Sequence, residues 1–343
     1  MPAGALVSAL ALVSGGLLVL GGSSADAVVP PRTHWSATSV VRGDVARVRV
    51  SRESRPAGTR LVLQRRNLDG WRTVDPTARL TERSWVLRVP TNQLGRFAFR
   101  VAAKSGGQVR TASHRADVRV RPTYRTAGSA ADHAFLGQRR FRWDPCRPVT
   151  WAFNPDHAPR HALAQIRTTI RQARQATGLR FEYAGRTRET PTLRPHHGAY
   201  AVIIGWRTPR SFRYFGNHPL RVGVGGASWH SGFEEADGRV VDKAWSGRLI
   251  LNARYSDDLR PGYGRGYTWG DVILHEFGHV LGLGHARDTT QLMYPQMTQR
   301  RARWGAGDLA GLRKLGSARG CLDRVSGRIH GHERAATTLP SKG

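Results

Sequence analysis

The sequence is poor in lysine, in acidic residues and in cysteine. Only four of its 54 basic residues are lysine, and 24 aspartates and glutamates leave a formal charge of +30. Arginines are spread along the whole chain, which is typical of the coding bias of a GC-rich genome, and a surface selected to bind polyanions is the alternative. The charge alone therefore identifies no function, and we predict no specific nucleic-acid partner.

Long apolar runs are absent after residue 20. The only such run, Ala5–Leu20, precedes Ala25-Asp26-Ala27, an A-x-A cleavage pattern, so residues 1–27 are predicted to be a signal peptide. No lysine or arginine precedes the run, and an uncleaved anchor is the alternative interpretation. No cysteine lies at the cleavage point, which excludes lipid attachment there. We expect a secreted, soluble mature protein without a membrane span.

The sequence contains only two cysteines, Cys146 and Cys321. In an oxidising compartment they can form a disulfide, and closing a loop of about 175 residues could contribute ~4–5 kcal/mol in the chain-entropy model. Two buried free thiols are the alternative. The remaining composition, with 39% hydrophobic and 23% charged residues, is that of a globular protein and excludes wholesale disorder and collagen-like repetition. At 343 residues the chain is expected to form two folded units.

The N-terminal unit, residues 28–122, is predicted to be all β. Apolar residues alternate with polar ones from Val41 to Val120, and glycine-containing turns separate six or seven short segments. This pattern predicts a β-sandwich. The stretches Leu61–Thr73 and Gly95–Val101 also resemble the immunoglobulin-like domains that are appended to many secreted bacterial proteins.

The pattern of apolar and polar residues changes after 123–134, a segment of small and polar residues that we interpret as a linker. Residues 135–322 mix strand-like runs with three stretches of helical periodicity, so this unit is predicted to be α+β. Residues 323–343 contain glycine, arginine and histidine without periodicity, and they are predicted to be a disordered basic tail.

One segment of the second unit carries a strong chemical signal. It contains His275, Glu276, His279, Gly282 and His285, in the pattern H-E-x-x-H-x-x-G-x-x-H. Residues four apart share a helix face, so the first two histidines can face one cation, and a glycine that ends the helix lets the third return as a ligand. Three imidazoles and an open fourth position are typical of a catalytic zinc site, whereas a structural site closes the fourth position, usually with cysteine.

The chemistry that follows is hydrolysis. Zinc polarises a carbonyl group and activates a water, and Glu276 is positioned to take the proton of that water and pass it to a leaving amine. We therefore predict one catalytic Zn²⁺, bound by His275, His279 and His285, with Glu276 as general base and acid. Three ordinary surface or core histidines are the alternative, and the pattern is too specific to arise readily by chance.

These residues, followed by Leu292-Met293-Tyr294-Pro295, resemble the metzincin metalloproteases, and His-Glu-Phe-Gly-His with Leu-Met-Tyr-Pro resembles the matrixin branch. The resemblance implies a multidomain chain in which the immunoglobulin-like sandwich precedes a metzincin catalytic domain, built of a twisted sheet, an active-site helix, a Met-turn and a C-terminal helix. It also implies that Met293 lies in the turn beneath the zinc and that Pro295 walls a substrate pocket. Asp308 is expected either to tie the last helix to that turn or to act as a plain helix cap.

The chain also departs from the matrixin pattern. Met297 stands where animal matrixins usually have tyrosine, and no Pro-Arg-Cys-Gly-like switch precedes the catalytic unit. Cys146 is expected to be a disulfide partner rather than a thiol that blocks zinc. The further metals of animal matrixins, a structural zinc and Ca²⁺, have no clear counterpart here. Four residues are candidate ligands for them but are more often plain surface residues: His218, His230, Asp257 and Asp258.

A glycine-rich segment, 222–230, has two interpretations. It can be the edge strand with which an extended substrate pairs, or a glycine-rich loop. The leading hypothesis for the whole chain is a secreted, monomeric zinc endopeptidase that acts on protein or peptide substrates. The alternative is a cell-surface module that binds acidic cell-wall or other polyanionic polymers and retains only a vestigial zinc site.

Overall fold

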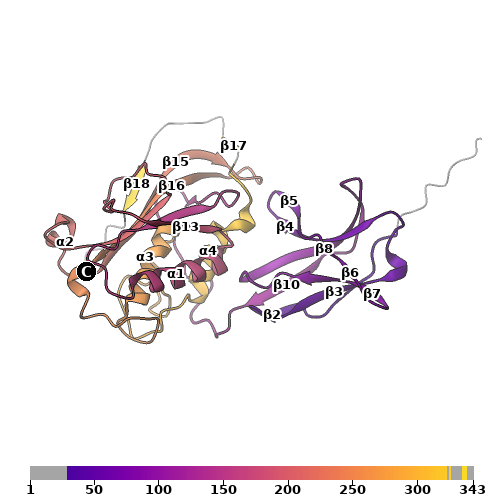
Figure 1. The fold of residues 1–343 in the computed structure, drawn as a ribbon, viewed down its shortest axis with the longest axis horizontal. Helices are drawn as coiled ribbons and strands as arrows, with labels where there is room; N and C mark the ends of the chain where they lie inside the picture. Colours follow the sequence, from indigo (N-terminus) through magenta and orange to yellow (C-terminus); the bar gives the residue numbers. More distant parts are fainter. Residues whose placement is uncertain (1–28, 323, 326–333, 338–343) are drawn as a thin grey trace, which may run out of the picture.

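A computed structural model describes residues 29–322, 324–325 and 334–337, so the predicted signal peptide lies outside the described residues. The chain forms an all-β N-terminal unit and an α+β C-terminal unit that lie side by side (Figure 1). Within the described residues, no helix is both long enough and apolar enough to cross a membrane.

The N-terminal unit consists of two sheets around one core. The strands alternate buried and exposed residues, as in Ala46–Ser51, where every second side chain is buried. The core includes Val48 and Leu87 from one sheet and Phe99 and Val118 from the other. One sheet has the order β1-β3-β7-β6 and the other β2-β10-β8-β4-β5, with β9 paired to β8. The strands are β1 (Thr33–Trp35), β2 (Ser39–Val41), β3 (Ala46–Ser51), β4 (Arg60–Asn67), β5 (Gly70–Asp75), β6 (Arg79–Leu80), β7 (Ser84–Val89), β8 (Gly95–Ser105), β9 (Gln108–Ala112) and β10 (Ala116–Arg121), and one 3₁₀ turn lies at Arg52–Ser54.

The C-terminal unit is built on a sheet whose central order is β13-β12-β14-β16-β15. The first four of these strands run parallel, and β15 is antiparallel to β16. A short strand, β11, adds to β16. The bounds are β11 (Phe141–Arg142), β12 (Val149–Phe153), β13 (Phe181–Arg186), β14 (Val202–Arg207), β15 (Gly223–Glu234) and β16 (Val240–Asn252).

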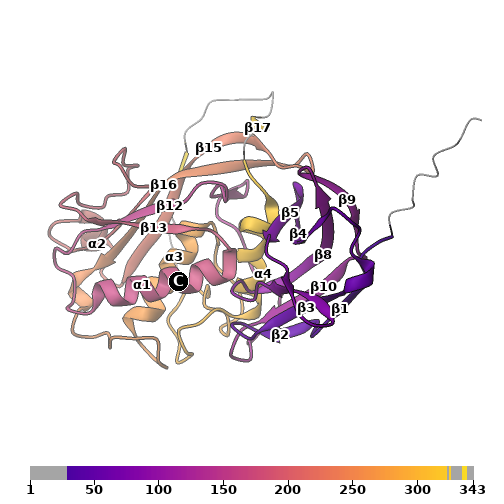
Figure 2. The ribbon, with the colours of Figure 1, turned by 45° about the vertical axis from the view of Figure 1, so that its right-hand side comes forward.

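Two long helices pack on the same side of this sheet (Figure 2). Helix α1 (Ala162–Thr177) buries Ile166, Ile170 and Ala173 at helical spacing and ends at Gly178, which adopts a left-handed conformation. Helix α3 (Trp269–Leu281) packs against α1 and against strands β15 and β16 of the sheet. The shorter elements are α2 (Arg213–Asn217), α4 (Ala306–Leu315) and 3₁₀ turns at Ala253–Tyr255 and Ser317–Arg319.

Part of the segment predicted to be a disordered tail is ordered as strands. β17 (Arg324–Val325) and β18 (Arg334–Thr337) both pair antiparallel with the outer edge of β15, and the other residues of 323–343 lie outside the described residues. The prediction of disorder is wrong for these six residues. An edge strand has unpaired backbone N–H and C=O groups, and any extended segment can pair with them. Such pairing does not require alternating side chains, so the sequence pattern does not predict it.

The two units are joined by backbone hydrogen bonds as well as by the chain. The N–H of Leu94 donates to the carbonyl of Gln175 at the end of α1 (2.7 Å), and that of Leu68 donates to the carbonyl of Ala318 (3.1 Å). The side chain of Gln93 donates to the carbonyl of Thr177 (3.2 Å). Fixed contacts of this kind on several loops hold the sandwich against the C-terminal unit.

The segment interpreted as a linker is also bound to the C-terminal unit. The hydroxyl of Tyr124 donates to the carbonyl of Trp304 (3.0 Å), and the N–H of Ala306 donates to the carbonyl of Ala127 (2.8 Å). Further along, the carboxylate of Asp132 accepts the N–H groups of residues 287 and 288 (3.0 and 2.8 Å). The segment therefore follows the surface of the C-terminal unit over much of its length.

Cys146 and Cys321 form a disulfide that joins the start of the C-terminal unit to its end. Replacing both by alanine is expected to lower the free energy of unfolding by ~2–4 kcal/mol, because the unfolded chain regains the freedom of a long loop. The measurement is the urea midpoint of unfolding of the double variant, of the reduced wild type and of the oxidised wild type. The first two midpoints should be equal to each other and lower than that of the oxidised wild type. An unchanged midpoint in both would contradict a stabilising role for the disulfide.

Candidate metal centre

Helix α3 begins and ends at residues suited to those positions. The hydroxyl of Thr268 accepts the N–H of Asp271 (3.2 Å) and caps the first turn. At the other end Gly282 adopts φ +107°, and its N–H closes the last turn. The helix therefore stops two residues after His279, at Leu281, and the chain turns back toward it.

This turn brings three histidines together. His275 and His279 lie one turn apart on α3, with their Nε2 atoms 3.1 Å apart. His285 returns after Gly282, and its ring centroid lies 5.4 Å from that of His275 and 4.8 Å from that of His279. One ligand nitrogen from each ring lies within 4.8 Å of the other two. The structure thus places the three predicted ligands around one point.

Hydrogen bonds fix the tautomers of the two helical histidines. The Nδ1 of His275 donates to the carbonyl of Leu292 (2.8 Å), and the Nδ1 of His279 donates to the carbonyl of Leu283 (2.7 Å), so each Nε2 keeps its lone pair. Burial lowers the pKa of all three histidines, that of His275 to about 3, which keeps the rings neutral as metal binding requires. Among the described residues no fourth histidine, cysteine or carboxylate joins this group. The donor set fits a zinc ion with one open position.

Glu276 lies beside the histidines, and its side chain is half-buried. Burial raises the pKa of its carboxyl group to about 7, and a hydrogen bond from the N–H of Gly225 opposes the rise. Its Oε2 has no hydrogen-bond partner among the described residues. An unpaired carboxylate oxygen with a pKa near neutrality is suited to exchanging a proton.

Strand β15 passes over Glu276 at very close range. A Cβ atom at Gly225 would overlap the backbone carbonyl of Glu276, and one at Gly223 would lie 2.8 Å from its Cγ. The glycine-rich segment is therefore a strand rather than a loop, and the glycines allow the strand to touch α3. Strand β18 pairs with β15 only from Gly226 to Trp229, beyond these two glycines.

Met293 packs against α3, the helix that carries two of the three histidines. The side chain is buried, and a Cβ at Gly278 of α3 would overlap its sulfur. The carboxylate of Asp308 accepts three backbone N–H groups, those of Leu292 (2.7 Å), Met293 (3.2 Å) and Gly305 (2.7 Å). Both expectations for Asp308 therefore hold together, because it caps α4 and also ties α4 to the turn that carries Met293.

A groove with a volume of about 1060 Å³ opens at the centre. Its lining includes Asp271 and Arg300, whose side chains form an ion pair at 3.4 Å, and burial raises the pKa of Asp271 to about 6. Arg300 also donates to the carbonyl of Leu292 (2.9 Å), the same oxygen that orients His275. The lining also includes His275, Glu276 and His285 of the centre, together with Tyr294, Pro295 and Met297.

Three contributors to this site were not predicted. Asp271 and Arg300 are 29 residues apart, and no local pattern signals their pairing. Gln291 accepts the N–H groups of Gly307 (2.8 Å) and Asp308 (3.3 Å) and so doubles the link between the Met293 turn and α4. The only available signal was its position two residues before Met293, which is not specific.

The other predicted ligands stand apart from the histidine triad. Within the described residues, His218, His230, Asp257 and Asp258 belong to no group of three possible metal ligands. His218 lines the groove, and the ring of His230 stacks on Trp245 with centroids 5.4 Å apart. Cys146 is bonded to Cys321 and therefore offers no thiol that could block the centre.

Comparison with known protein families finds a match to the second half of the chain. Residues 228–315 match the family described as Matrixin. The matched segment contains α3, the three histidines, Met293 and Asp308, and it begins within β15. The match supports a matrixin-like zinc metalloprotease as the general nature of this part of the chain.

Proposed function

We propose that the protein is a zinc-dependent endopeptidase in which His275, His279 and His285 hold the metal and Glu276 moves the proton. The observation that carries this proposal is the convergence of three neutral imidazoles, with ligand nitrogens within 4.8 Å of one another, beside a carboxylate at the bottom of an open groove. A structural metal site would be closed by a fourth side chain and would need no groove.

The zinc ion, Glu276 and the backbone around the histidines would each have a separate role in peptide hydrolysis. When bound, zinc supplies Lewis acidity, which polarises the scissile carbonyl and acidifies the attacking water. Glu276 accepts the proton of that water and delivers it to the leaving nitrogen, and its pKa near 7 suits both directions of transfer. The backbone carbonyls of Leu292 and Leu283 hold the rings of His275 and His279 in the orientation that presents Nε2 to the metal.

The shape of the groove favours a protein or peptide substrate. It has a volume of about 1060 Å³, and its lining joins the metal centre to Pro295, Met297 and the ion pair of Asp271 and Arg300. Pro295 is exposed and Met297 half-buried, so these two side chains are available to wall a pocket for a substrate side chain.

We also propose that the protein is exported and acts as a monomer. The A-x-A pattern at Ala25-Asp26-Ala27 supports export, and a disulfide between Cys146 and Cys321 is expected in an oxidising compartment. Acidic cell-wall polymers would then be among the molecules that the strongly basic surface meets.

Chelation should distinguish this function from binding alone. The purified protein, incubated with a denatured proteome, is expected to generate new peptide termini, and 1,10-phenanthroline should abolish them because apo-histidines cannot polarise a carbonyl. Mass spectrometry of the termini, with and without chelator, is the measurement. Added Zn²⁺ should restore cleavage. Undiminished formation of new termini after complete removal of zinc would contradict the proposal that the protein is a zinc-dependent peptidase.

A further inference from the structure

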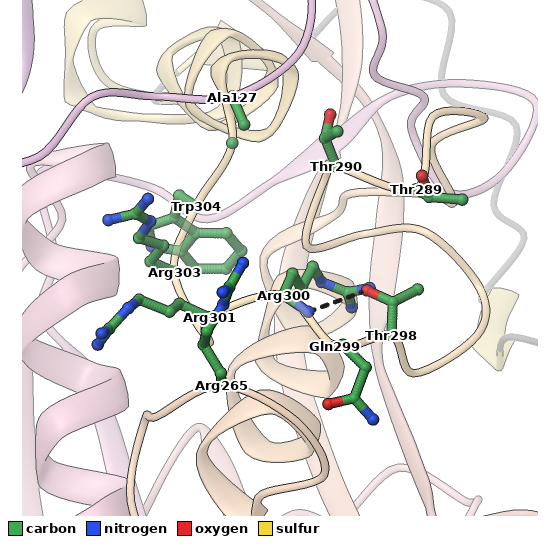
Figure 3. Close-up of a pocket in the computed structure, with 11 residues that line it drawn as sticks. Ala127, Arg265, Thr289, Thr290, Thr298, Gln299, Arg300, Arg301, Arg303 and Trp304 are labelled. Carbon is green, nitrogen blue, oxygen red and sulfur yellow. Dashed lines mark hydrogen bonds between the residues drawn. The ribbon is translucent and has the colours of Figure 1, made fainter.

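A second cavity, with a volume of about 480 Å³, lies next to the groove and shares Arg300 with it. Its lining includes four arginines and no aspartate or glutamate. Three threonines, Gln299 and Trp304 also line it. Figure 3 shows Arg265, Arg301 and Arg303 gathered beside Trp304, with Thr298 and Thr290 across from them.

Three of these arginines have no acidic partner. Arg300 is committed to Asp271, to the carbonyl of Leu292 and to Thr298. By contrast, no ion pair among the described residues involves Arg265, Arg301 or Arg303. The cavity therefore concentrates positive charge that the folded chain leaves uncompensated.

The backbone holds two of these charges opposite each other. Arg265 and Arg301 form an antiparallel bridge, and the flanking hydrogen bonds join Gly266 to Arg300 and Ala302 to Gly264 (both 3.3 Å). This pattern makes the two arginines a non-hydrogen-bonded pair, in which side chains approach most closely. Like charges at such positions repel, so an anion between them would stabilise the fold.

Two further features suit an anion. The guanidinium of Arg303 stacks on the ring of Tyr124 at 4.6 Å, which orients the group while leaving its N–H edge available. Trp304 is only 1% exposed, and its Nε1 has no hydrogen-bond partner among the described residues. The indole of Trp304 forms part of the cavity wall beside the arginines.

We propose that this cavity, which we call the arginine pocket (Arg265, Arg301, Arg303, Trp304 and the threonines around them), binds a phosphate or sulfate group. Arginine forks match tetrahedral oxyanions with paired hydrogen bonds, and threonine hydroxyls add further donors. The volume greatly exceeds the ~30 Å³ that a water molecule occupies, so it leaves room for the chain to which such a group is attached. The source is either a free ion or one unit of an anionic polymer.

The test compares two double variants of the full chain. Arg265→Gln/Arg301→Gln removes the opposed pair of the arginine pocket. Arg47→Gln/Arg88→Gln removes an equally exposed opposed pair, on β3 and β7 of the sandwich, and changes the net charge by the same amount. Calorimetric titrations with sodium phosphate, sodium sulfate and linear polyphosphate, at constant ionic strength, give the affinities. Thermal unfolding confirms that both variants are folded.

We expect the pocket variant to bind at least about ten-fold more weakly and the sandwich variant to bind like the wild type. If inorganic phosphate or sulfate shows this difference, a free ion is sufficient, whereas a difference with polyphosphate alone identifies a polymer as the source. Arg265→Lys/Arg301→Lys should give an intermediate loss, because lysine keeps the charge but not the fork. Equal weakening in the pocket and sandwich variants, or saturable binding in neither the wild type nor any variant, would overturn the proposal. None of these readouts depends on peptidase activity.

Discussion

A Glu276→Gln variant is expected to lose peptide hydrolysis by roughly 10²–10⁴-fold in kcat while keeping its zinc. Glutamine has nearly the same shape as glutamate, but its amide cannot accept the proton of the attacking water. The three histidines lose no contact, and two of them keep their hydrogen bonds to Leu292 and Leu283, so the metal should stay in place. The measurements are kcat on a fluorogenic peptide and the zinc content by mass spectrometry.

The matched control is Glu182→Gln, an exposed glutamate on β13 that undergoes the same change of charge. It should retain the wild-type kcat and the wild-type zinc content. Wild-type turnover in Glu276→Gln would remove this residue from the mechanism. Loss of zinc together with activity would instead show that Glu276 supports the metal site, and it would leave its role as a base without support.

The second large effect concerns Asp308, where alanine is expected to lower the free energy of unfolding of the C-terminal unit by about 3–5 kcal/mol. The substitution leaves three buried N–H groups without an acceptor, at about 1–3 kcal/mol each. Burial raises the pKa of Asp308, so the native carboxylate itself is held at some cost, and the net loss falls below the full sum. Asp308→Asn should recover only part of the loss, because the new amide nitrogen would face N–H donors.

Urea unfolding, followed by tryptophan fluorescence, is the measurement for Asp308→Ala and Asp308→Asn. Asp257→Ala, which removes an exposed carboxylate from the same unit, is the control and should shift the midpoint little. Zinc retention provides a second readout, because the turn that Asp308 holds carries the carbonyl that orients His275. A midpoint within error of the control would show that Gln291 alone secures the turn.

The parts of the site that the sequence predicts are those set by local geometry. The spacing of His275 and His279 follows from the helix period, and Thr268 and Gly282 mark the bounds of α3 through their own conformational preferences. The alternation of apolar residues likewise predicts the strands of the sandwich. In each case the information lies within a few residues along the chain.

The parts that the sequence leaves open depend on distant partners. The glycines at 223 and 225 lie in a strand that packs closely against α3. The sequence around these glycines does not show that α3 lies against them, so it does not distinguish a strand from a loop. The ion pair of Asp271 and Arg300 is set by tertiary packing in the same way. The strand β18 forms by pairing with the unpaired edge of β15. The composition of residues 334–337 does not predict this pairing.

The binding of residues 124–132 to the C-terminal unit has a consequence for the survival of the chain. A peptidase shares its solution with its own exposed segments, and extended, mobile loops are the preferred sites of cleavage. Here the hydroxyl of Tyr124, the carbonyl of Ala127 and the carboxylate of Asp132 form hydrogen bonds that must break before this stretch could enter any groove. In the proposed peptidase, this attachment would protect the connection between the two units against self-digestion, although its small polar residues would otherwise make it an easy substrate.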